Sequence, residues 1–429
     1  MKQIKYPNKA NWPALLKRPE FERSQFTKVV SEILAEVKEN GDDALYNFAE
    51  KFDDVKLNSL IVTQQEVEVA NSQVSAELSN AIKLAKANIE KFHEAQNITE
   101  PVIQTTKGVS CWRRSVGIEK VGLYIPGGSA PLFSTILMLA IPAKIAGCSE
   151  IVLCTPPNSE GSIDPAILYT AKLVGVSKIY KVGGAQAIAA MAFGTESIPQ
   201  VYKIFGPGNQ YVTKAKELIQ QEGVAIDMPA GPSEVLIIAD NTCNASFVAA
   251  DLLSQAEHGA DSQVILLSDD QNVIAEVNIQ LEIQLAQLPR VEIATKALKN
   301  SRSILLKNMA ECVAFSNEYA PEHLIIASEV ADTFIENIVN AGSVFLGNYS
   351  CESAGDYASG TNHTLPTNGY ARNYSGVSLD SFVKKITFQK LEREGIINIG
   401  PAIEIMAEAE QLFAHKNAVT LRLKEIRNV

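Results

Sequence analysis

Hydrophobic and polar positions follow two different patterns along this chain. Between Phe21 and about Asn97, apolar residues recur at three- and four-residue spacing, for example over Thr27–Glu39 and Ser75–Phe92, which predicts amphipathic helices. From Val121 onwards, short apolar runs alternate with longer helical stretches. Short apolar strands that alternate with helices indicate parallel βαβ units and therefore doubly wound sheets.

The apolar runs after Val121 form two series, separated by the segment Met228–Ser233. Their predicted strands begin at Val121, Glu150, Lys178, Val201 and Val224 in the first series, and at Glu234, Val264, Leu324 and Ser343 in the second. The pattern predicts an α/β fold with two doubly wound, incomplete Rossmann-like sheet domains, a helical N-terminal region and a helical C-terminal tail.

The same pattern suggests domain boundaries. We expect residues 1–20 to form an irregular N-terminal arm and residues 379–429 a helical tail that contributes to a dimer. Residues 21–120 and 233–378 are predicted to form a first, discontinuous α/β domain with most of the metal and catalytic site. Residues 121–232 are predicted to form the second α/β domain.

Charge and composition exclude several classes of protein. The 429 residues carry a formal net charge of −11, whereas nucleic acid and anionic membranes attract concentrated Lys and Arg. The longest apolar run, near Ile136–Ile141, is interrupted by Pro142 and Lys144, so no membrane helix is predicted. The N-terminus has no apolar signal segment, and the six cysteines include no CxxC pair, so we expect a cytoplasmic protein with reduced thiols.

Histidine is rare, and four of its five positions lie in the C-terminal half beside groups that could take part in chemistry. The exception is His93, which we expect to be exposed on a polar helix. Imidazole is a common metal ligand and titrates near neutral pH, so the other four positions are candidates for a metal site or for proton transfer.

A zinc site is one candidate. Gln255 and His258 lie three residues apart near the end of a predicted helix, and therefore on one face of it. Glu257 is the more usual ligand by chemistry, but it points about 100° away from His258 around the helix. Asp356 lies in a loop rich in Gly and Ser, where an ordinary turn residue is the alternative. Together with His415 of the tail, these side chains could form a zinc site of nitrogen and oxygen ligands.

The tail needs a break if two of its residues are to act together. Glu410 precedes His415 by five positions and would not share a face with it on one straight helix. The helix would then have to break near Lys416–Asn417, with Asn417 capping the next helix. Earlier in the tail, Gly400–Pro401 predicts that a helix begins near residue 402.

Glu322 and His323 follow Pro321 at the start of a predicted strand. An adjacent carboxylate and imidazole can act as two bases on one substrate if both face a cleft, and an ordinary polar turn is the alternative. His363 lies in a polar loop, where hydrogen bonds within the loop are the alternative to a functional contact.

Three Gly-rich turns connect a strand to a helix in the first series, at Gly127–Ser129, Gly183–Gln186 and Phe205–Asn209. Free backbone N–H groups and the helix dipole favour an anion at such turns. No GxGxxG motif follows a strand, so the standard dinucleotide fingerprint is absent. Three turns at the carboxyl ends of strands in one domain nevertheless favour a nucleotide ligand.

The sequence closely resembles the histidinol dehydrogenase family over nearly its whole length. The motifs that carry the resemblance are Gly122–Gly128, Gly183–Ala190, Phe205–Asn209, Asp227–Val235, Ser254–Gly259, Pro321–Leu324 and His415–Arg422. The resemblance implies the last step of histidine biosynthesis, in which L-histidinol is oxidised through L-histidinal to L-histidine. It also implies two NAD molecules per turnover and one Zn²⁺ per subunit.

The resemblance also implies roles for individual residues. The implied zinc ligands are Gln255, His258, Asp356 and His415, which favours Gln255 over Glu257. The implied catalytic bases are Glu322 and His323. The implied substrate contacts are Ser233, His363 and Glu410, besides the zinc ligands and His323, and the implied NAD contacts are Tyr124, Gln186 and Asn209.

The resemblance further implies a mechanism and an assembly. Zinc would hold the imidazole and amine of histidinol, His323 would accept the hydroxyl proton, and Glu322 would activate water for the second oxidation. Members of the family act as homodimers, and we hypothesise that His415 and Glu410 come from the partner subunit.

Two rival hypotheses fit parts of the pattern. A zinc hydrolase of a small amine or amide would use Glu322 as its base, but it leaves the Gly-rich turns unexplained. The second rival is a non-catalytic, zinc-dependent binding protein for small amines. Periplasmic binding proteins also have two α/β domains, but they need an export signal, and we find none here. Formation of NADH separates all three hypotheses.

Overall fold

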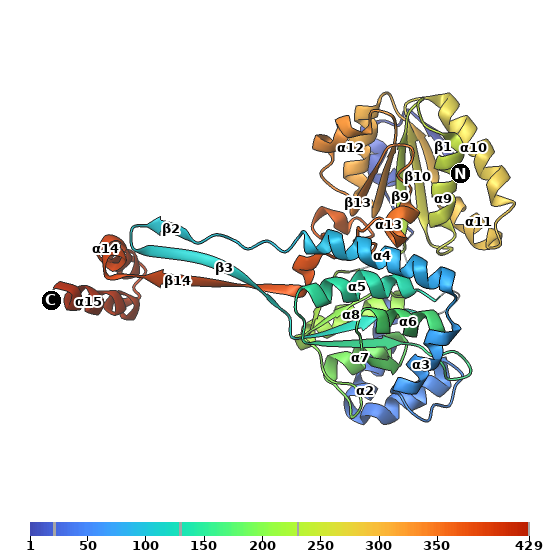
Figure 1. Cartoon of the computed structure of the whole chain (residues 1–429). Coiled ribbons are helices and arrows are strands. Elements are labelled where there is room, and N and C mark those ends of the chain that lie inside the picture. Colours follow the sequence, from blue (N-terminus) through green and yellow to red (C-terminus); the bar gives the residue numbers. More distant parts are fainter. Residues whose placement is uncertain (20–22, 128–130, 230, 428–429) are drawn as a thin grey trace.

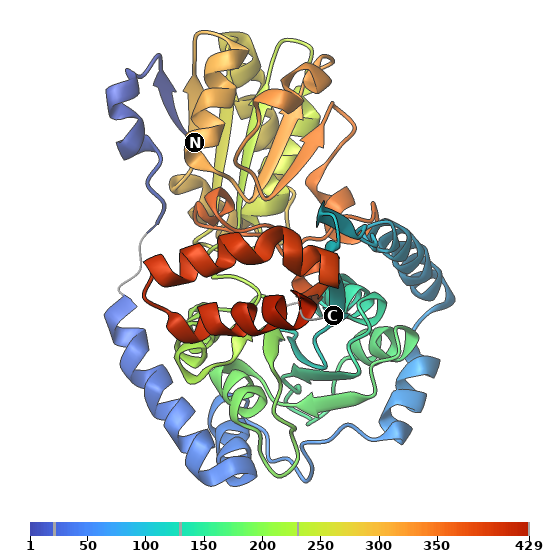
Figure 2. The same cartoon turned by 90° about the vertical axis from the view of Figure 1, so that its left-hand side faces the viewer.

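The computed structural model describes residues 1–19, 23–127, 131–229 and 231–427. They form two α/β units, one above the other in Figure 1, and an arm that projects away from both. In Figure 2 the arm points toward the viewer, and its two helices lie in front of the region between the units. We name the units the sheet A unit and the sheet B unit.

Sheet A has six parallel strands between two helical layers, in the order β1-β11-β10-β9-β12-β13. The strands are β1 (Lys2–Lys5), β9 (Glu234–Ala239), β10 (Gln263–Ser268), β11 (Arg302–Leu305), β12 (His323–Ala327) and β13 (Ser343–Leu346). The helices are α1 (Trp12–Leu15), α9 (Ala245–Ala256), α10 (Gln271–Leu285), α11 (Val291–Lys299), α12 (Met309–Tyr319) and α13 (Glu352–Tyr357). Alternate residues of β9 pack into two cores, Val235 and Ile237 with α9, and Leu236 and Ile238 with α12. This alternation buries both faces, as expected for a doubly wound sheet.

Sheet B has five parallel strands in the order β6-β5-β4-β7-β8. The strands are β4 (Lys120–Tyr124), β5 (Glu150–Thr155), β6 (Lys178–Lys181), β7 (Lys203–Phe205) and β8 (Ala225–Ile226). The covering helices are α5 (Phe133–Ile145), α6 (Pro165–Leu173), α7 (Gly184–Phe193) and α8 (Gln210–Ile219), with α2 (Arg23–Phe52), α3 (Gln64–Gln73) and α4 (Ala76–Glu94) outside them.

The two sheets share one strand order. If the strands of each βαβ series are numbered along the chain, both sheets read 3-2-1-4-5, and sheet A carries β1 as an additional edge strand. This order matches the first five strands of a doubly wound nucleotide-binding fold. The prediction of two doubly wound α/β sheets is therefore confirmed.

The N-terminal helices pack differently from the prediction. The sequence predicts that residues 21–120 join residues 233–378, but α2 packs on α7 and α8, α3 on α6, and α4 on α5. The reason lies in α5 and α7, which bury residues all around their circumference and therefore need a further layer outside them. The N-terminal helices supply that layer to sheet B.

Both ends of the chain contain strands that the sequence analysis missed. The predicted irregular arm at residues 1–20 includes β1, which pairs in parallel with β11. The predicted helical tail begins with β14 (Val383–Leu391), which pairs along its whole length with β3 (Val109–Gly117), and β3 pairs with β2 (Ile103–Thr106). These three antiparallel strands carry α14 (Arg393–Ala409) and α15 (Phe413–Arg427) and form the arm.

Three local predictions about helices are wrong. Pro401 does not open a helix but lies inside α14, where Gly400 lets Leu423 of α15 pack closely on the helix. The break in the tail lies at Glu410–Leu412, with Gln411 at φ +60°, and Lys416–Asn417 lie inside α15. His93 is fully buried, because it continues the apolar stripe of α4. Among the described residues, no helix has the length and apolar character needed to cross a membrane.

Candidate active site

The two predicted bases lie at the beginning of β12, at the amino ends of the sheet A strands. Glu322 and His323 are 6% and 4% exposed. The chain reaches them through a sharp turn in which Ala320, the C-cap of α12, has φ +54°, a left-handed conformation that is uncommon without glycine. This turn directs both side chains toward the first residue of the neighbouring strand β9.

That residue, Glu234, holds both bases through its main chain. The N–H of Glu234 donates to Oε2 of Glu322 at 2.9 Å, and its carbonyl oxygen lies 3.3 Å from Nδ1 of His323. Burial raises the pKa of Glu322 to about 7, against the opposing effects of His323 and the Glu234 N–H. A carboxylate with this pKa is suited to act as a general base near neutral pH.

His323 lies among three carboxylates. Its Nδ1 is 3.7 Å from Glu322 and 4.0 Å from Glu352, and its Nε2 is 3.6 Å from Oδ1 of Asp356. Burial alone would lower the pKa of His323, but the carboxylates of Glu352, Glu322 and Asp356 together raise it to about 10. Nε2 is buried without a hydrogen-bond partner among the described residues, so it is available to a ligand.

A group of ligand atoms beside His323 could hold a cation. His258, Glu352 and Asp356 each offer one such atom, and these atoms lie within 4.8 Å of one another. Gln255 is fully buried next to them, and with its amide nitrogen turned toward Glu352 it donates to both carboxylate oxygens, at 2.5 and 3.3 Å. That orientation leaves the amide oxygen, the atom that binds metals, free of Glu352.

Glu352 was missed in the sequence analysis. It lies one helical turn before Asp356 on α13, so the two carboxylates share a face. The i, i+4 spacing of Glu352 and Asp356 was a usable signal once a helix, rather than a loop, is expected there.

His363 connects this cluster to the sheet B unit. Its Nδ1 lies 2.8 Å from the carbonyl oxygen of Asp356, and its Nε2 lies 3.1 Å from Oγ1 of Thr135, in the first turn of α5. Ser233 lies half-buried immediately before Glu234. The candidate substrate residues of the sheet A unit therefore lie where that unit meets the sheet B unit.

Two of the predicted site residues lie elsewhere. Glu410 and His415 are exposed at the turn and the first helical turn between α14 and α15, at the far end of the arm. Within one chain, the structure does not bring them to Gln255, His258 and Asp356.

The predicted nucleotide contacts line a large cavity at the carboxyl ends of the sheet B strands. The cavity has a volume of about 1160 Å³, and Tyr124, Gln186 and Asn209 all contribute to its wall. The hydroxyl of Tyr124 accepts a hydrogen bond from the N–H of Gly184 at 3.1 Å, and burial raises the pKa of Tyr124 to about 12. The Asn209 side chain caps α8 by accepting from the N–H groups of Tyr211 and Val212.

Of the three Gly-rich turns, two have the predicted geometry. Gly183–Gly184 joins β6 to α7, and Gly206–Gly208 joins β7 to α8. The third, Gly127–Ser129, lies largely outside the described residues, as does Ala230 of the Met228–Ser233 segment.

Comparisons with known proteins agree on one family. A family model described as histidinol dehydrogenase matches residues 16–423. Histidinol dehydrogenase of Bacteroides thetaiotaomicron is 60% identical over 427 residues, which cover 100% of both chains. That of Salmonella typhimurium is 54% identical over 417 residues, which cover 96% of this chain and 95% of the relative.

A solved structure agrees as closely. The crystal structure of histidinol dehydrogenase from Elizabethkingia anophelis has a TM-score of 0.98 to this fold at 60% identity. The match covers 100% of this chain and 99% of that one. The two α/β units and the arm are thus similar to a fold already observed in a crystal.

Proposed function

This chain belongs to the histidinol dehydrogenase family, and from that membership we propose that it oxidises L-histidinol through bound L-histidinal to L-histidine with zinc and two NAD molecules. The observation that carries the proposal is the group of buried Glu322 and His323 with partly buried Asp356. Asp356 also belongs to the group of potential metal ligands, with His258 and Glu352. No rival hypothesis needs both two buried bases and a nucleotide-sized cavity.

We propose that Gln255, His258 and Asp356 hold zinc. Their donor atoms are one amide oxygen, one imidazole nitrogen and one carboxylate oxygen, a set that suits Zn²⁺ in a site open to a substrate. When bound, zinc would hold the imidazole and amine of histidinol and orient its hydroxyl group. His323 must be neutral to accept a proton, and a cation on Asp356 would weaken one of the three carboxylate effects that raise its pKa, beside those of Glu352 and Glu322.

The two bases act in turn. His323 accepts the hydroxyl proton while a hydride passes from the carbinol carbon to NAD, which gives the bound aldehyde and NADH. Glu322 then takes a proton from water as the water oxygen adds to the aldehyde carbon. The hydrate anion loses a second hydride to a second NAD, and the carboxylic acid formed in this way releases a proton to solvent and becomes the carboxylate of L-histidine. Glu322 and His323 lie close enough to serve the same carbon, since 3.7 Å separates them.

NAD is proposed to bind in the cavity of the sheet B unit. Tyr124, Gln186 and Asn209 line it, and two helix N-termini with Gly-rich turns face it, where N–H groups favour phosphate. Thr135 connects the same end of the unit to His363. A nicotinamide held at this end would lie toward the substrate side of the cluster.

We further propose that His415 and Glu410 complete the site of a partner subunit. They lie on the arm, far along it from the cluster of their own chain, together with exposed apolar side chains such as Ile405, Met406 and Phe413, which are 68%, 64% and 62% exposed. Apolar patches of this kind mark interaction surfaces.

Mixing two inactive variants tests the exchange. A His258→Ala chain and a His415→Ala chain are each expected to be inactive alone. If the arm reaches the partner, their mixed dimer contains one intact site, and full subunit exchange restores about a quarter of the wild-type activity. If His415 acts within its own chain, every site keeps one defect and no activity returns.

The stoichiometry of NADH tests the reaction itself. Purified protein with zinc, NAD and limiting L-histidinol is expected to form two NADH per histidinol, and a chelator should abolish the signal until zinc is restored. One NADH per histidinol would show that the aldehyde escapes and would remove the role given to Glu322. No NADH at all would favour the hydrolase or the binding protein.

A further inference from the structure

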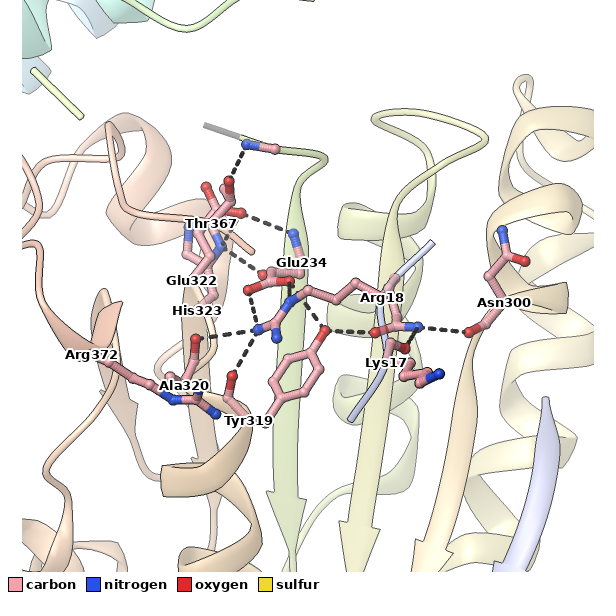
Figure 3. Close-up of polar contacts among 12 residues, drawn as sticks. Lys17, Arg18, Glu234, Asn300, Tyr319, Ala320, Glu322, His323, Thr367 and Arg372 are labelled. Atoms are coloured by element: carbon pink, nitrogen blue, oxygen red, sulfur yellow. Dashed lines mark hydrogen bonds and ion pairs between the residues drawn. The ribbon is translucent and has the colours of Figure 1, made fainter. Parts of the chain in front are cut away.

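A buried polar network lies directly behind the two proposed bases (Figure 3). It consists of Arg18 from the N-terminal segment, Glu234 at the start of β9, and Tyr319 at the end of α12. The side chains of Arg18 and Glu234 are only 13% and 3% exposed. A buried ion pair of this kind has a large desolvation penalty, so its retention calls for a structural or functional reason.

The guanidinium of Arg18 donates two parallel hydrogen bonds to the carboxylate of Glu234. Its Nε donates to Oε2 at 2.6 Å, and its Nη2 donates to Oε1 at 2.8 Å. The guanidinium also lies 3.9 Å from the centre of the Tyr319 ring. The Tyr319 hydroxyl lies 3.2 Å from Oε2 of Glu234 and 2.8 Å from Oε1 of Gln263, at the start of β10. The carboxylate of Glu234 is therefore fixed from two sides.

Arg18 also holds the turn that leads to the bases. Its Nη2 donates to the carbonyl oxygens of Tyr319, at 2.8 Å, and Ala320, at 3.4 Å. These are carbonyls at the C-terminal end of α12, which lack helical partners and favour a cation. Ala320 is the residue with φ +54°, and Pro321 and Glu322 follow it directly. A guanidinium at this point thus stabilises a strained turn next to the active site.

Both contacts of Arg18 lead to the same two side chains. Through Glu234, Arg18 fixes the N–H that binds Glu322 and the carbonyl that lies beside His323. Through Tyr319 and Ala320, it fixes the chain from which Glu322 and His323 extend. No other cation reaches the Glu234 carboxylate among the contacts observed in the described part of the chain.

We propose that Arg18 is a positioning residue for the oxidation, which clamps Glu234 to the end of α12 and thereby sets the positions of Glu322 and His323. The proposal rests on the base roles of Glu322 and His323 proposed above. In this proposal Arg18 acts through the residues that it holds, namely Glu234, Tyr319 and Ala320.

A purely structural role for Arg18 is the alternative, and Arg302 provides the matched control. Arg302 tethers the same N-terminal segment, since its Nη1 donates to the carbonyl oxygens of Leu15, at 2.6 Å, and Lys17, at 3.3 Å. It makes no contact with Glu234 or with the turn at Ala320 among the hydrogen bonds observed. A variant of Arg302 therefore loosens the segment without releasing the clamp.

The test compares Arg18→Met, Arg18→Lys and Arg302→Met with zinc bound. Arg18→Met is expected to lower kcat for both L-histidinol and L-histidinal about 100-fold, because small displacements of catalytic groups have effects of that size. The KM for NAD should stay within twofold of wild type, since Arg18 is not among the residues that line the proposed NAD cavity. The kcat of Arg18→Lys should fall between those of wild type and Arg18→Met, because an ammonium group keeps the charge but cannot make the two parallel hydrogen bonds. Added guanidinium ion should restore part of the kcat of Arg18→Met, and Arg302→Met should keep the wild-type kcat.

Equal losses of kcat in Arg18→Met and Arg302→Met, or no rescue by guanidinium in a folded Arg18→Met, would overturn the proposal. If Arg18→Met does not fold, Arg18→Lys provides the test, and a wild-type kcat for Arg18→Lys would reject the positioning role of Arg18. A Glu322→Gln variant in the same assay separates failure of the proposed function from failure of the Arg18 proposal. If Glu322→Gln forms histidine at the wild-type rate, the proposed base role fails. If Glu322→Gln is slow as expected but the Arg18 variants keep the wild-type kcat, only the role of Arg18 is rejected.

Discussion

The two sheets have the same strand order, yet their candidate sites lie at opposite ends of equivalent strands. In sheet B, the cavity lies at the carboxyl ends of β4 and β7. In sheet A, the bases lie at the amino ends of β9 and β12, which occupy the equivalent positions. The first arrangement follows the usual rule for doubly wound sheets, and the second departs from it.

The ends of the helices account for the difference. At the carboxyl ends of the strands, helices begin, and their free N–H groups favour anions such as a pyrophosphate. At the amino ends, helices finish, and their free carbonyls favour cations. The sheet B site accordingly consists of turns with glycine and backbone N–H groups. The sheet A site consists of side chains, Arg18 and the proposed metal ligands among them.

The comparison predicts its largest effect for a side chain of the sheet A site. Glu322→Gln keeps the size of the side chain but removes the base, so we expect oxidation of L-histidinal to slow by about 10²–10⁴-fold. Oxidation of L-histidinol to the aldehyde should continue. Stopped-flow measurement of NADH with each substrate separates the two steps. Glu329→Gln, exposed just beyond the other end of β12, is the control and should leave both steps unchanged.

For sheet B, the comparison predicts that backbone changes matter most. Gly206 has φ +130°, and a Cβ there would lie 2.0 Å from the carbonyl oxygen of Tyr124. We expect Gly206→Ala to lower the free energy of unfolding by at least about 3 kcal/mol and to raise the KM for NAD. Gly223→Ala is the matched control, because Gly223 has φ +90° but open space around it. Gly223→Ala should lower the free energy of unfolding, measured with urea, by only about 1–2 kcal/mol. Equal decreases for both variants would contradict the steric argument.

The two sites should also differ in how they respond to pH. Burial raises the pKa of Glu322 to about 7, and a general base must be ionised. The value of kcat/KM for L-histidinal should therefore fall about tenfold per pH unit below that value and level off above it. Tyr124, with a pKa near 12, stays neutral throughout, so NAD binding should not follow this profile. A profile for L-histidinal that is flat from pH 5 to 8 would count against Glu322 as the base.

The smallest effect is expected for a side chain of the sheet B site. Tyr124→Phe removes the hydroxyl that accepts the Gly184 N–H, a loss of about 1 kcal/mol. The KM for NAD should rise about fivefold with little change in kcat. Tyr211→Phe lines the same cavity but is 42% exposed, so its KM should change less.

Local pattern was sufficient to predict the five strands of sheet B and four of the six strands of sheet A, but not β1 or β11. The apolar runs at Val121, Glu150 and Glu234 are buried between helical layers, and such burial leaves a clear signal in the sequence. The sequence signal for the strands of the arm was weak. The nine residues of β14 are mostly exposed, so their apolar positions are not constrained to alternate. Which sheet α2–α4 would cover depends on the shapes of distant surfaces, and no local pattern encodes it.

Some features of the candidate site could likewise be predicted from the sequence, and others could not. The adjacency of Glu322 and His323 and the closeness of Gln255 to His258 were visible in the sequence, but α9 ends at Ala256 and His258 lies in the turn after it. The network of Arg18, Glu234 and Tyr319 was not, because its members are about 85 to 300 residues apart and come from three separate elements. His93 is a different case: Ile82, Ala85 and Ile89 precede it at helical spacing, so its burial could have been predicted.

The pairing of β1 with β11 bears on how the chain is made. Lys2 lies opposite Arg302, so about 300 residues must be synthesised after β1 before its partner strand exists. At 5–20 residues per second, that wait is roughly 15–60 seconds. The sheet B unit has all its strands before residue 227 and can close during this interval. Until β11 is made, β1 has no partner strand in the nascent chain, and Arg18 has no carboxylate partner until Glu234, 216 residues later, is made.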